Sequence, residues 1–326
     1  MSKMSSSLAE RSKTKKEDPV ITIQKINNVQ VKPMKIKNKL DRPAKGHDMF
    51  TNPYSNIFIL SRKNSGKSVL IANIIKKCCR KDFTTVVVFS NTIHKDPTWI
   101  ALKKWCKKKG LDFVGHTSIR YTDSNGSKKD ALNDLLKKDR EVGDEEELDS
   151  EESKSEDQSS YSSEEDESMS EPDEPHFNFG LRPSKPIKMI SERPSTKIEY
   201  PTIAPRLFIV FDDISSDLKL PSVQELIKQN RHYESMCCFS SQHIKDLLPS
   251  CHQNADAYCL FSGLGEDALA KIKEDASLHV SLNTLMKMYK KATEKKFSFF
   301  YIDVRNDQFR VNFNRKFNII TNKDDE

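Results

Sequence analysis

The feature that most constrains the fold is a short apolar run followed directly by a turn of small and basic residues. Residues 56–60 are NIFIL and residues 61–68 are SRKNSGKS. The apolar run predicts a buried strand, and the segment from Gly66 to about Arg80 predicts a helix that begins where the turn ends. This order places the unpaired backbone N–H groups of a helix N-terminus at the turn, where they suit a phosphate group.

The turn is similar to the phosphate-binding loop G-x-x-x-x-G-K-[ST]. We expect Lys67 to contact the β- and γ-phosphates of ATP and Ser68 to offer its hydroxyl to Mg²⁺. Ser61 stands where the first glycine is usual, and glycine is favoured there for unusual backbone angles. The alternative is a coincidental Gly-Lys turn, against which the flanking strand and helix argue. The predicted nucleotide-binding residues are Ser61, Arg62, Lys63, Asn64, Ser65, Gly66, Lys67 and Ser68.

A second apolar run ends in two carboxylates. Residues 206–217 are RLFIVFDDISSD, which predicts a buried strand that ends in Asp212 and Asp213. The carboxyl ends of parallel strands form the edge at which α/β sheets bind ligands. We predict that Asp212 holds the Mg²⁺ shell through water and that Asp213 orients or deprotonates the attacking water. Acids after a strand are common, so this prediction depends on the turn at 61–68.

Two further residues are weaker candidates for catalysis. Gln242 ends the sequence SSQ after another predicted strand, where it could contact both the γ-phosphate and the attacking water. The alternative there is that Ser241 caps a helix before His243. Arg231 is a candidate to neutralise charge across a subunit boundary, and an ordinary surface arginine is an equal alternative.

Strands alternate with helices along most of the chain. Strands are predicted at 84–90, 207–211, 236–241 and 257–261, and a helix at about 99–109. Repeated βα units of this length predict a three-layer α/β domain around a mainly parallel sheet. Near the C-terminus, the segments KFSFFYIDV and QFRVNF predict a closing β-hairpin.

Charge is distributed unevenly along the chain. The 54 basic and 48 acidic residues give a formal net charge of +6. Residues 141–174 hold 17 acidic residues and one lysine, a net of −16, so the rest of the chain carries a net of +22. Such a basic remainder favours a polyanionic partner, nucleic acid, over charge that serves solubility alone.

Composition divides the chain into five parts. Residues 1–45 are predicted to be a basic, flexible arm. Residues 124–200 are predicted to be a disordered acidic insertion, because so few apolar side chains cannot offset the entropy of ordering. The ATPase domain is predicted to consist of residues 46–123 and 201–320, followed by a tail at 321–326.

Several classes of protein are excluded. No apolar run approaches the ~18–20 residues of a membrane span, and the N-terminus has no apolar signal core, so we expect a protein without a membrane span in a cytosol-like compartment. The seven cysteines form no C-x-x-C pattern. They are predicted to be buried, reduced thiols and not disulfides or zinc ligands.

Five segments together resemble the DNA-packaging ATPases of large double-stranded DNA viruses and virophages, in the FtsK–HerA superfamily of translocases. They are FILSRKNSGKSVL, VVVFSNTIHKDPTW, LFIVFDDI, NRHYESMCCFSSQ and MYKKATEKKFSFFYID. The D-P-x-W after the second strand, and the R-H and S-Q around the fourth, are the more specific parts. The resemblance covers about residues 45–115 and 200–315.

The resemblance implies a RecA-like fold, ATP with Mg²⁺, a homo-oligomeric ring, and double-stranded DNA pumped into a capsid at its portal vertex. By position it assigns the nucleotide, metal, acid and sensor roles to Lys67, Ser68, Asp212, Asp213 and Gln242. The family tends to show an arginine just before an asparagine after the sensor strand. Here His252 and Gln253 precede Asn254, so no arginine finger is assigned in this way.

Three functions remain open. The first is a viral genome-packaging translocase, located in the host cytoplasm, in a viral factory or with the virion. The second is a cellular or plasmid DNA pump or helicase of the same superfamily. The third is a basic virion DNA-binding protein without catalysis, against which the intact Lys67, Ser68, Asp212 and Asp213 argue.

Overall fold

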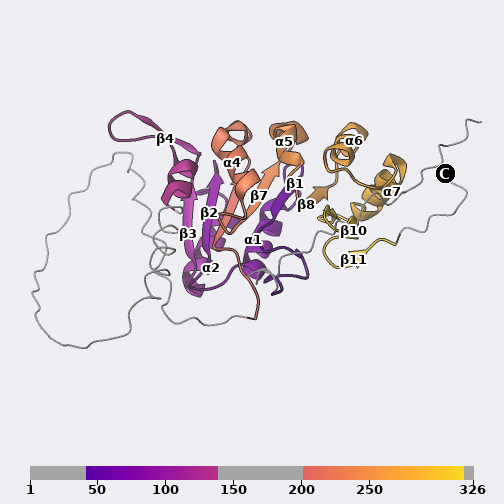
Figure 1. Ribbon diagram of the computed structural model, residues 1–326, viewed down its shortest axis with the longest axis horizontal. Helices are drawn as coiled ribbons and strands as arrows, with labels where there is room; N and C mark the ends of the chain where they lie inside the picture. Colours follow the sequence, from indigo (N-terminus) through magenta and orange to yellow (C-terminus); the bar gives the residue numbers. More distant parts are fainter. Residues whose placement is uncertain (1–41, 139–200, 319–326) are drawn as a thin grey trace, which may run out of the picture. The chain divides into compact units, whose positions relative to one another are not determined.

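A single nine-stranded sheet organises the computed structural model, which describes residues 42–138 and 201–318 (Figure 1). The strands of this sheet are β1 (Asn56–Leu60), β2 (Thr85–Ser90), β3 (Asp112–His116), β6 (Leu207–Asp212), β7 (Ser235–Ser241), β8 (Ala257–Phe261), β9 (Phe299–Asp303), β10 (Gln308–Val311) and β11 (Arg315–Lys316). Their spatial order is β11-β10-β9-β8-β1-β7-β6-β2-β3.

Six adjacent strands, from β8 to β3 in that order, are parallel. Strands β9, β10 and β11 extend the sheet in antiparallel fashion beside β8. Strand β7 lies between β1 and β6, although it follows both in the sequence. The carboxyl ends of β1, β7 and β6 therefore meet at one edge of the sheet.

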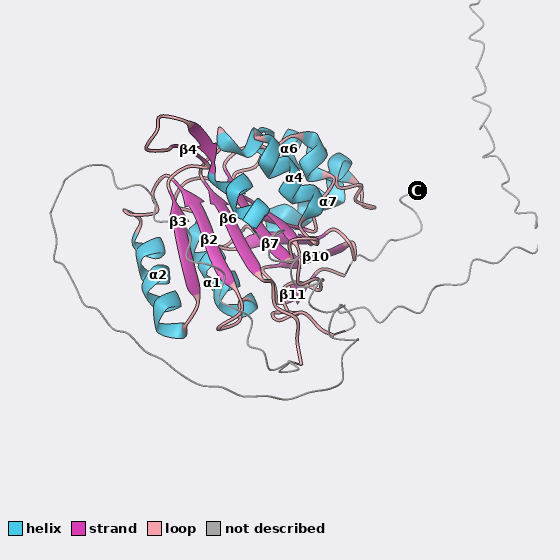
Figure 2. Cartoon of the chain, turned by 60° about the vertical axis from the view of Figure 1, so that its left-hand side comes forward, coloured by secondary structure: helices cyan, strands magenta, loops and turns pink. Residues whose placement is uncertain are grey.

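Helices cover both faces of the sheet. They are α1 (Lys67–Cys78), α2 (Pro97–Lys109), α4 (Pro221–Gln229), α5 (Pro249–His252), α6 (Glu266–Asp275) and α7 (Leu282–Ala292), with the short 3₁₀ helices η2 (Asp217–Lys219) and η3 (Ile244–Asp246). Figure 2 shows α1 and α2 on one side of the sheet and α4, α6 and α7 on the other.

The two faces have separate hydrophobic cores because successive side chains of a strand point in opposite directions. Ile57 and Ile59 of β1 pack with buried residues of α1 and α2. Phe58 and Leu60 pack with buried residues of α4, α6 and α7. The predicted three-layer α/β domain with a mainly parallel central sheet is therefore confirmed.

The strand predictions are confirmed to within one residue at each end. The continuous apolar runs that predicted β1, β2, β6, β7 and β8 are buried along their whole length. The predicted closing hairpin is the antiparallel pair of β9 and β10, in which Asp303 lies opposite Gln308. Helix α2 begins two residues before the predicted start, at Pro97, since proline is favoured in the first turn.

The folded part of the chain continues past residue 124, where the disordered insertion was predicted to begin. Strands β4 (Arg120–Thr122) and β5 (Lys128–Asp130) form a separate antiparallel pair. A helical segment, 131–138, follows and buries Leu132, Leu135 and Leu136 in the main core. Leucines at this spacing lie on one face of a helix, a signal that the surrounding charge conceals. The remainder of the predicted insertion, 139–200, lies outside the described residues.

The end of the predicted basic arm also joins the fold. Ala44 is buried and forms a parallel bridge with Ile203. The Lys45 N–H donates to the Ile203 carbonyl at 2.6 Å, and the Ile203 N–H donates to the Pro43 carbonyl at 2.9 Å. The segment before β1 is thus tied to the segment before β6. Residues 1–41 and the predicted tail at 321–326 lie outside the described residues.

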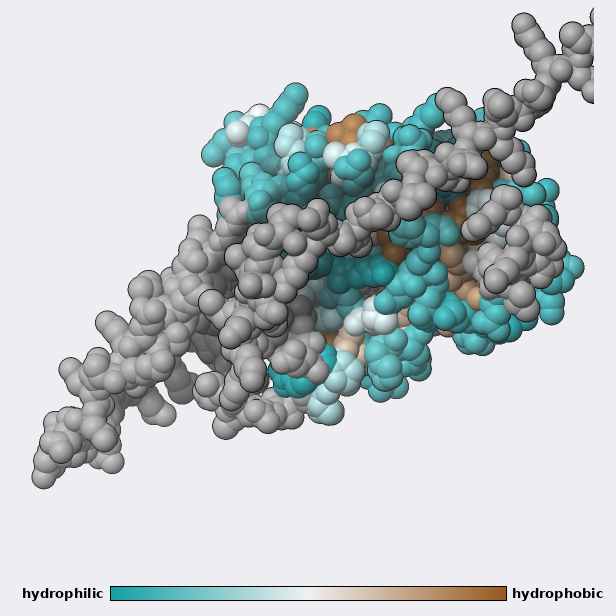
Figure 3. Space-filling view, turned by 45° about the vertical axis from the view of Figure 1, so that its right-hand side comes forward, coloured by the Kyte–Doolittle hydropathy of each residue, from teal (hydrophilic) through white to brown (hydrophobic). Residues whose placement is uncertain are grey.

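The surface of the described residues is largely polar. Hydrophilic residues make up most of the coloured surface in Figure 3. Only Val69, Ile100 and Phe297 are large hydrophobic residues with high exposure in the described ranges. All seven cysteines are buried free thiols, as predicted. None of the helices in these two ranges is long and apolar enough to span a membrane.

Candidate nucleotide-binding site

Three of the predicted site segments converge where β1, β7 and β6 end. Leu60 lies opposite Ser241, and Asp212 lies opposite Ser240, in the register of the parallel strands. The Ser61 N–H donates to the Ser241 carbonyl at 3.0 Å. The loop after β1, the acids after β6 and the polar end of β7 are therefore fixed side by side by backbone pairing.

The loop at 61–66 has its unusual backbone angles at two positions, Asn64 (φ 58°) and Gly66 (φ 95°). Asparagine and glycine are the residues that adopt left-handed angles most readily. Ser61 is not among the described residues with positive φ. Position 61 therefore does not require a glycine, contrary to expectation. Ser61 departs from the motif without backbone strain.

Helix α1 has an open N-terminus. Gly66 stands at its N-cap and has no side chain that could cap the first N–H groups. By contrast, α2 is capped by the Asp96 carboxylate, which accepts the Thr98 N–H at 2.7 Å. Uncapped N–H groups and the positive end of the helix dipole favour an anion at this place.

The loop also contains polar atoms that lack partners. Ser61 Oγ and Ser65 Oγ are buried and have no hydrogen-bond partner in the protein. Buried hydroxyls without partners are rare, because each costs about 1–3 kcal/mol. Together with the open end of α1, they fit a ligand with many acceptor oxygens, such as a polyphosphate.

Lys67 is the centre of the site. It is only 8% exposed, and its Nζ lies 3.6 Å from Asp212 Oδ1 and forms an ion pair with Asp213 Oδ1. A buried ammonium requires such partners because removing an ion from water costs several kcal/mol. One cation between two carboxylates leaves an excess of negative charge, which a divalent cation could balance.

Asp212 is buried and held from several sides. Burial raises the pKa of Asp212, and the charge of Lys67 opposes that rise. The indole Nε1–H of Trp99 donates to Asp212 Oδ2 at 3.2 Å, and this hydrogen bond also lowers the pKa of Asp212. Trp99 is completely buried in the first turn of α2.

Sequence reasoning did not find this role of Trp99. The tryptophan entered only as part of the D-P-x-W segment in the family resemblance. The sequence showed only that Trp99 lies near the start of the helix after β2. The order of the strands adds that β2 lies directly beside the strand that carries Asp212.

Asp213 differs from Asp212 in its surroundings. Its backbone is left-handed, with φ 52°, and its side chain is 37% exposed. The Asp213 N–H donates to the Ser240 carbonyl at 3.3 Å, and its own carbonyl accepts from Asn91 Nδ2 at 3.4 Å. The turn therefore directs one carboxylate towards solvent while the preceding one remains buried.

The candidate sensor Gln242 is half-buried just beyond the end of β7. Ser241 Oγ accepts the His243 N–H at 3.1 Å and donates to Asp246 Oδ2. Ser241 thus closes a local turn, while His243 occupies the N-cap of η3. The Ser215 hydroxyl, in the loop after β6, donates to the same Asp246 oxygen at 2.8 Å. These contacts fix the segment that carries Gln242.

A second loop supports the phosphate-binding loop from the β8 side. A Cβ at Gly263, whose φ is 102°, would lie 2.5 Å from Arg62 Nε, so the Arg62 side chain packs directly on this glycine. The Tyr289 hydroxyl of α7 accepts the Leu264 N–H at 2.9 Å and donates to the Phe261 carbonyl at 2.7 Å. Arg62 therefore rests on a loop that α7 holds in place.

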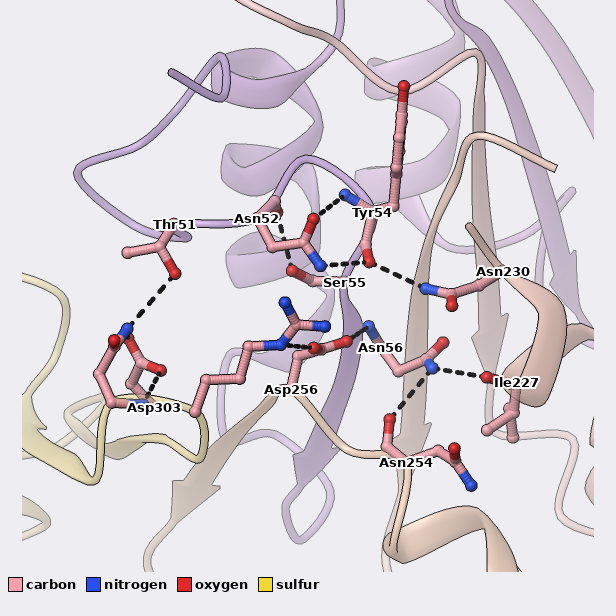
Figure 4. Close-up of polar contacts among 12 residues, drawn as sticks. Thr51, Asn52, Tyr54, Ser55, Asn56, Ile227, Asn230, Asn254, Asp256 and Asp303 are labelled. Atoms are coloured by element: carbon pink, nitrogen blue, oxygen red, sulfur yellow. Dashed lines mark hydrogen bonds and ion pairs between the residues drawn. The ribbon is translucent and has the colours of Figure 1, made fainter. Parts of the chain in front are cut away.

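Arg231 does not lie near the other candidate site residues within one chain. It is exposed in the turn between α4 and β7, at the amino ends of the parallel strands. Figure 4 shows the polar network at that edge, where the Asn56 N–H donates to Asp256 Oδ2 at 2.8 Å. Burial raises the pKa of Asp256, and the charges of Arg305 and Arg231 oppose that rise. Arg305 Nε also forms an ion pair with Asp256 Oδ1.

His252, which precedes Asn254 by two residues, has a structural role. It is 1% exposed, and its ring lies 5.3 Å from that of Phe58. Its Nε2 lies 2.9 Å from the Ile244 carbonyl. Burial lowers the pKa of His252. The residue contributes to the core and does not replace an arginine finger.

The residues that could hold Mg²⁺ are Ser68, in the first turn of α1, and Asp212. No group of three or more His, Cys, Asp or Glu residues suited to a metal occurs in the described ranges. In proteins Mg²⁺ usually takes one or two carboxylate ligands and completes its shell with phosphate and water oxygens.

No protein-family model matches the chain, and no curated protein matches it. Among solved structures, it aligns with the DNA-packaging ATPase B204 of Sulfolobus turreted icosahedral virus, at 16% identity and a TM-score of 0.43, over 80% of this chain and 98% of that one. It also aligns with the genome packaging NTPase B204 of Sulfolobus turreted icosahedral virus 2, in complex with AMP, at 15% identity and a TM-score of 0.42, over 80% of this chain and 98% of that one. Both similarities are at low sequence identity.

Replacing Trp99 with phenylalanine tests the contact to Asp212. The variant keeps an aromatic ring in the core and removes the N–H that lowers the pKa of Asp212. The pKa of Asp212 should therefore rise further. On acidification, the ATP hydrolysis predicted from the sequence should then be lost at a higher pH in the variant than in the wild type. At neutral pH the rate should fall about tenfold, as for other partners of metal ligands.

Steady-state hydrolysis across pH, with a thermal melt as a folding check, measures both effects. Trp105→Phe in the same helix is the control, because Trp105 contacts Lys76 and not the acids. An unchanged pH profile in Trp99→Phe would show that the indole only fills space.

Proposed function

We propose that this chain binds ATP with Mg²⁺ at the carboxyl edge of its sheet and hydrolyses it. The observation that carries the proposal is Lys67, held between Asp212 and Asp213 at the open N-terminus of α1. A lysine, two acids and an uncapped helix end are the groups that phosphoryl chemistry needs for positioning and charge stabilisation.

Each residue has a separate task in this proposal. The backbone N–H groups of 61–68 hold the phosphates, and Lys67 exchanges its pair with Asp213 for the β- and γ-phosphates. Ser68 and Asp212 hold Mg²⁺, which when bound neutralises charge on the phosphate oxygens. Asp213, released from Lys67 and open to solvent, orients or deprotonates the attacking water. Gln242 contacts that water and the γ-phosphate from the neighbouring strand.

We further propose that hydrolysis drives double-stranded DNA through a homo-oligomeric ring and into a viral capsid at its portal vertex. The resemblance of the five sequence segments supports this, as does the net charge of +22 outside the acidic block. Arg231 lies at the opposite edge from Lys67, so a role as arginine finger requires that it come from a neighbouring subunit. Such a protein would act in the host cytoplasm or a viral factory, or with the virion.

The two open alternatives are distinguished by different measurements. A cellular or plasmid pump has the same motor residues and is distinguished by the absence of capsid association. A DNA-binding protein without catalysis would not hydrolyse ATP with or without DNA. Lys67 and both acids argue against the latter, because a buried ionic cluster without a ligand is costly to retain.

Two substitutions test the assigned chemistry. Lys67→Ala removes the charge that contacts the phosphates, so ATP binding or turnover should be abolished. Asp213→Asn should still bind ATP and should hydrolyse it about a thousandfold more slowly, because the base that positions water is lost. Single-turnover hydrolysis and nucleotide binding are the measurements. Lys104→Ala, an exposed lysine of α2, is the matched control. Turnover at the wild-type rate in both site variants would refute the assignment.

DNA binding should be independent of sequence and steeply dependent on salt. If about five or six phosphates are contacted, affinity should fall by about a hundredfold or more between 50 and 200 mM salt, since each contact releases counterions. Titration of two labelled duplexes of unrelated sequence at several salt concentrations measures both properties. A flat salt response, or strong preference for one duplex, would contradict backbone contact by a translocase.

A further inference from the structure

Phe297 is an exposed aromatic residue beside the phosphate-binding loop. It lies between α7 and β9 and is 58% exposed. A Cβ at Gly66 would lie 3.3 Å from its Cδ1 atom, so the ring is next to the N-cap of α1. Val69, in the first turn of α1, is 55% exposed. Two of the three exposed large hydrophobic residues of the described ranges therefore lie around one end of one helix.

The topology of the sheet brings Phe297 to this place. Strand β9 is antiparallel to β8, and Phe299 lies opposite Phe261 at the carboxyl end of β8. The residues just before β9 therefore reach the same edge as the carboxyl ends of β8 and β1. The phosphate-binding loop begins at that edge, directly after β1.

The loop holds the ring in an exposed position. Phe297 has a φ of 66°, a left-handed conformation that is rare for a bulky residue. Hydrogen bonds hold both ends of the loop: Thr293 Oγ1 donates to the Tyr289 carbonyl at 2.9 Å, and the Ser298 N–H donates to the Lys295 carbonyl at 3.0 Å. Strained backbone angles of this kind are among the features that cluster at ligand sites and active sites.

The position of the acids indicates which part of a nucleotide reaches Phe297. Asp212, Asp213 and Gln242 follow β6 and β7, which lie on one side of β1. The terminal phosphate must lie on that side, because the acids act on it. The nucleoside therefore leaves the loop on the other side, towards β8 and β9, where Phe297 is found.

We propose that Phe297 stacks on the base of the bound nucleotide and that Val69 extends this apolar surface towards the sugar. The inference rests on the proposed nucleotide site and adds its base-binding part. An exposed phenylalanine offers a flat apolar face without hydrogen-bond donors, so it suits the large ring of a purine through stacking alone. The Nζ of Lys296 lies over one face of the ring, 4.9 Å from its centroid, so the other face is the one that a base would stack on.

The test compares a ligand that has a base with one that lacks it. ADP and inorganic pyrophosphate, each with Mg²⁺, are titrated calorimetrically into the full-length wild-type, Phe297→Ala and Phe297→Tyr proteins. Phe297→Ala should weaken ADP binding by about tenfold, the usual scale of base stacking, and leave pyrophosphate binding unchanged. Phe297→Tyr keeps the ring and should bind both ligands as the wild type does. Ile100→Ala, an exposed apolar residue of α2, is the control for loss of surface hydrophobicity.

The outcomes separate this inference from the function on which it rests. If the wild type binds neither ligand, the nucleotide site itself is wrong. If Phe297→Ala binds ADP as tightly as the wild type, the stacking role is wrong while the site stands. An equal loss of ADP and pyrophosphate binding would also overturn the inference, because Phe297 would then support the shape of the phosphate-binding loop and not the base.

Discussion

A lysine ammonium buried at the end of a sheet is stable only when carboxylates lie beside it, and the rest of the candidate site depends on this constraint. Lys67 follows β1, whereas Asp212 and Asp213 end β6, and β7 lies between the two strands. The ion pairs therefore cross a neighbouring strand and fix the turns after β1 and β6. Removing either partner of a buried pair usually costs about 3–5 kcal/mol, so the sheet edge is electrostatically fixed before any ligand arrives.

The supports of this edge come from different layers of the fold. Trp99 reaches Asp212 from α2 on one face of the sheet, while Tyr289 of α7 holds the loop on which Arg62 rests. Helix α2 is capped by a side chain, and α1 is not. The two edges of the sheet also differ: the carboxyl edge carries the open loop, and the amino edge carries the hydrogen-bonded network around Asp256 (Figure 4).

Much of the fold was predictable because buried parallel strands leave continuous apolar runs in the sequence, as β1, β2 and β6 do. The grouping of Lys67 with Asp212 and Asp213 was predictable because the loop that carries Lys67 and the two acids each come at the carboxyl end of such a run. The contact of Trp99 was not, since it depends on which strands are neighbours. The helix at 131–138 was hidden by surrounding charge, and the place of Phe297 depends on the antiparallel return of β9. Local sequence patterns predict which segments are buried and where turns lie. The order of the strands depends on the whole chain and cannot be predicted from them.

The most direct test of the site is a structure of the full-length protein with Mg²⁺ and a non-hydrolysable ATP analogue. We expect Lys67 Nζ to leave Asp213 and to lie about 3 Å from oxygens of the β- and γ-phosphates. Asp212 should remain hydrogen-bonded to Trp99 and face the metal shell. An analogue bound away from residues 61–68, or one bound there with the pair of Lys67 and Asp213 intact, would contradict this assignment of the site.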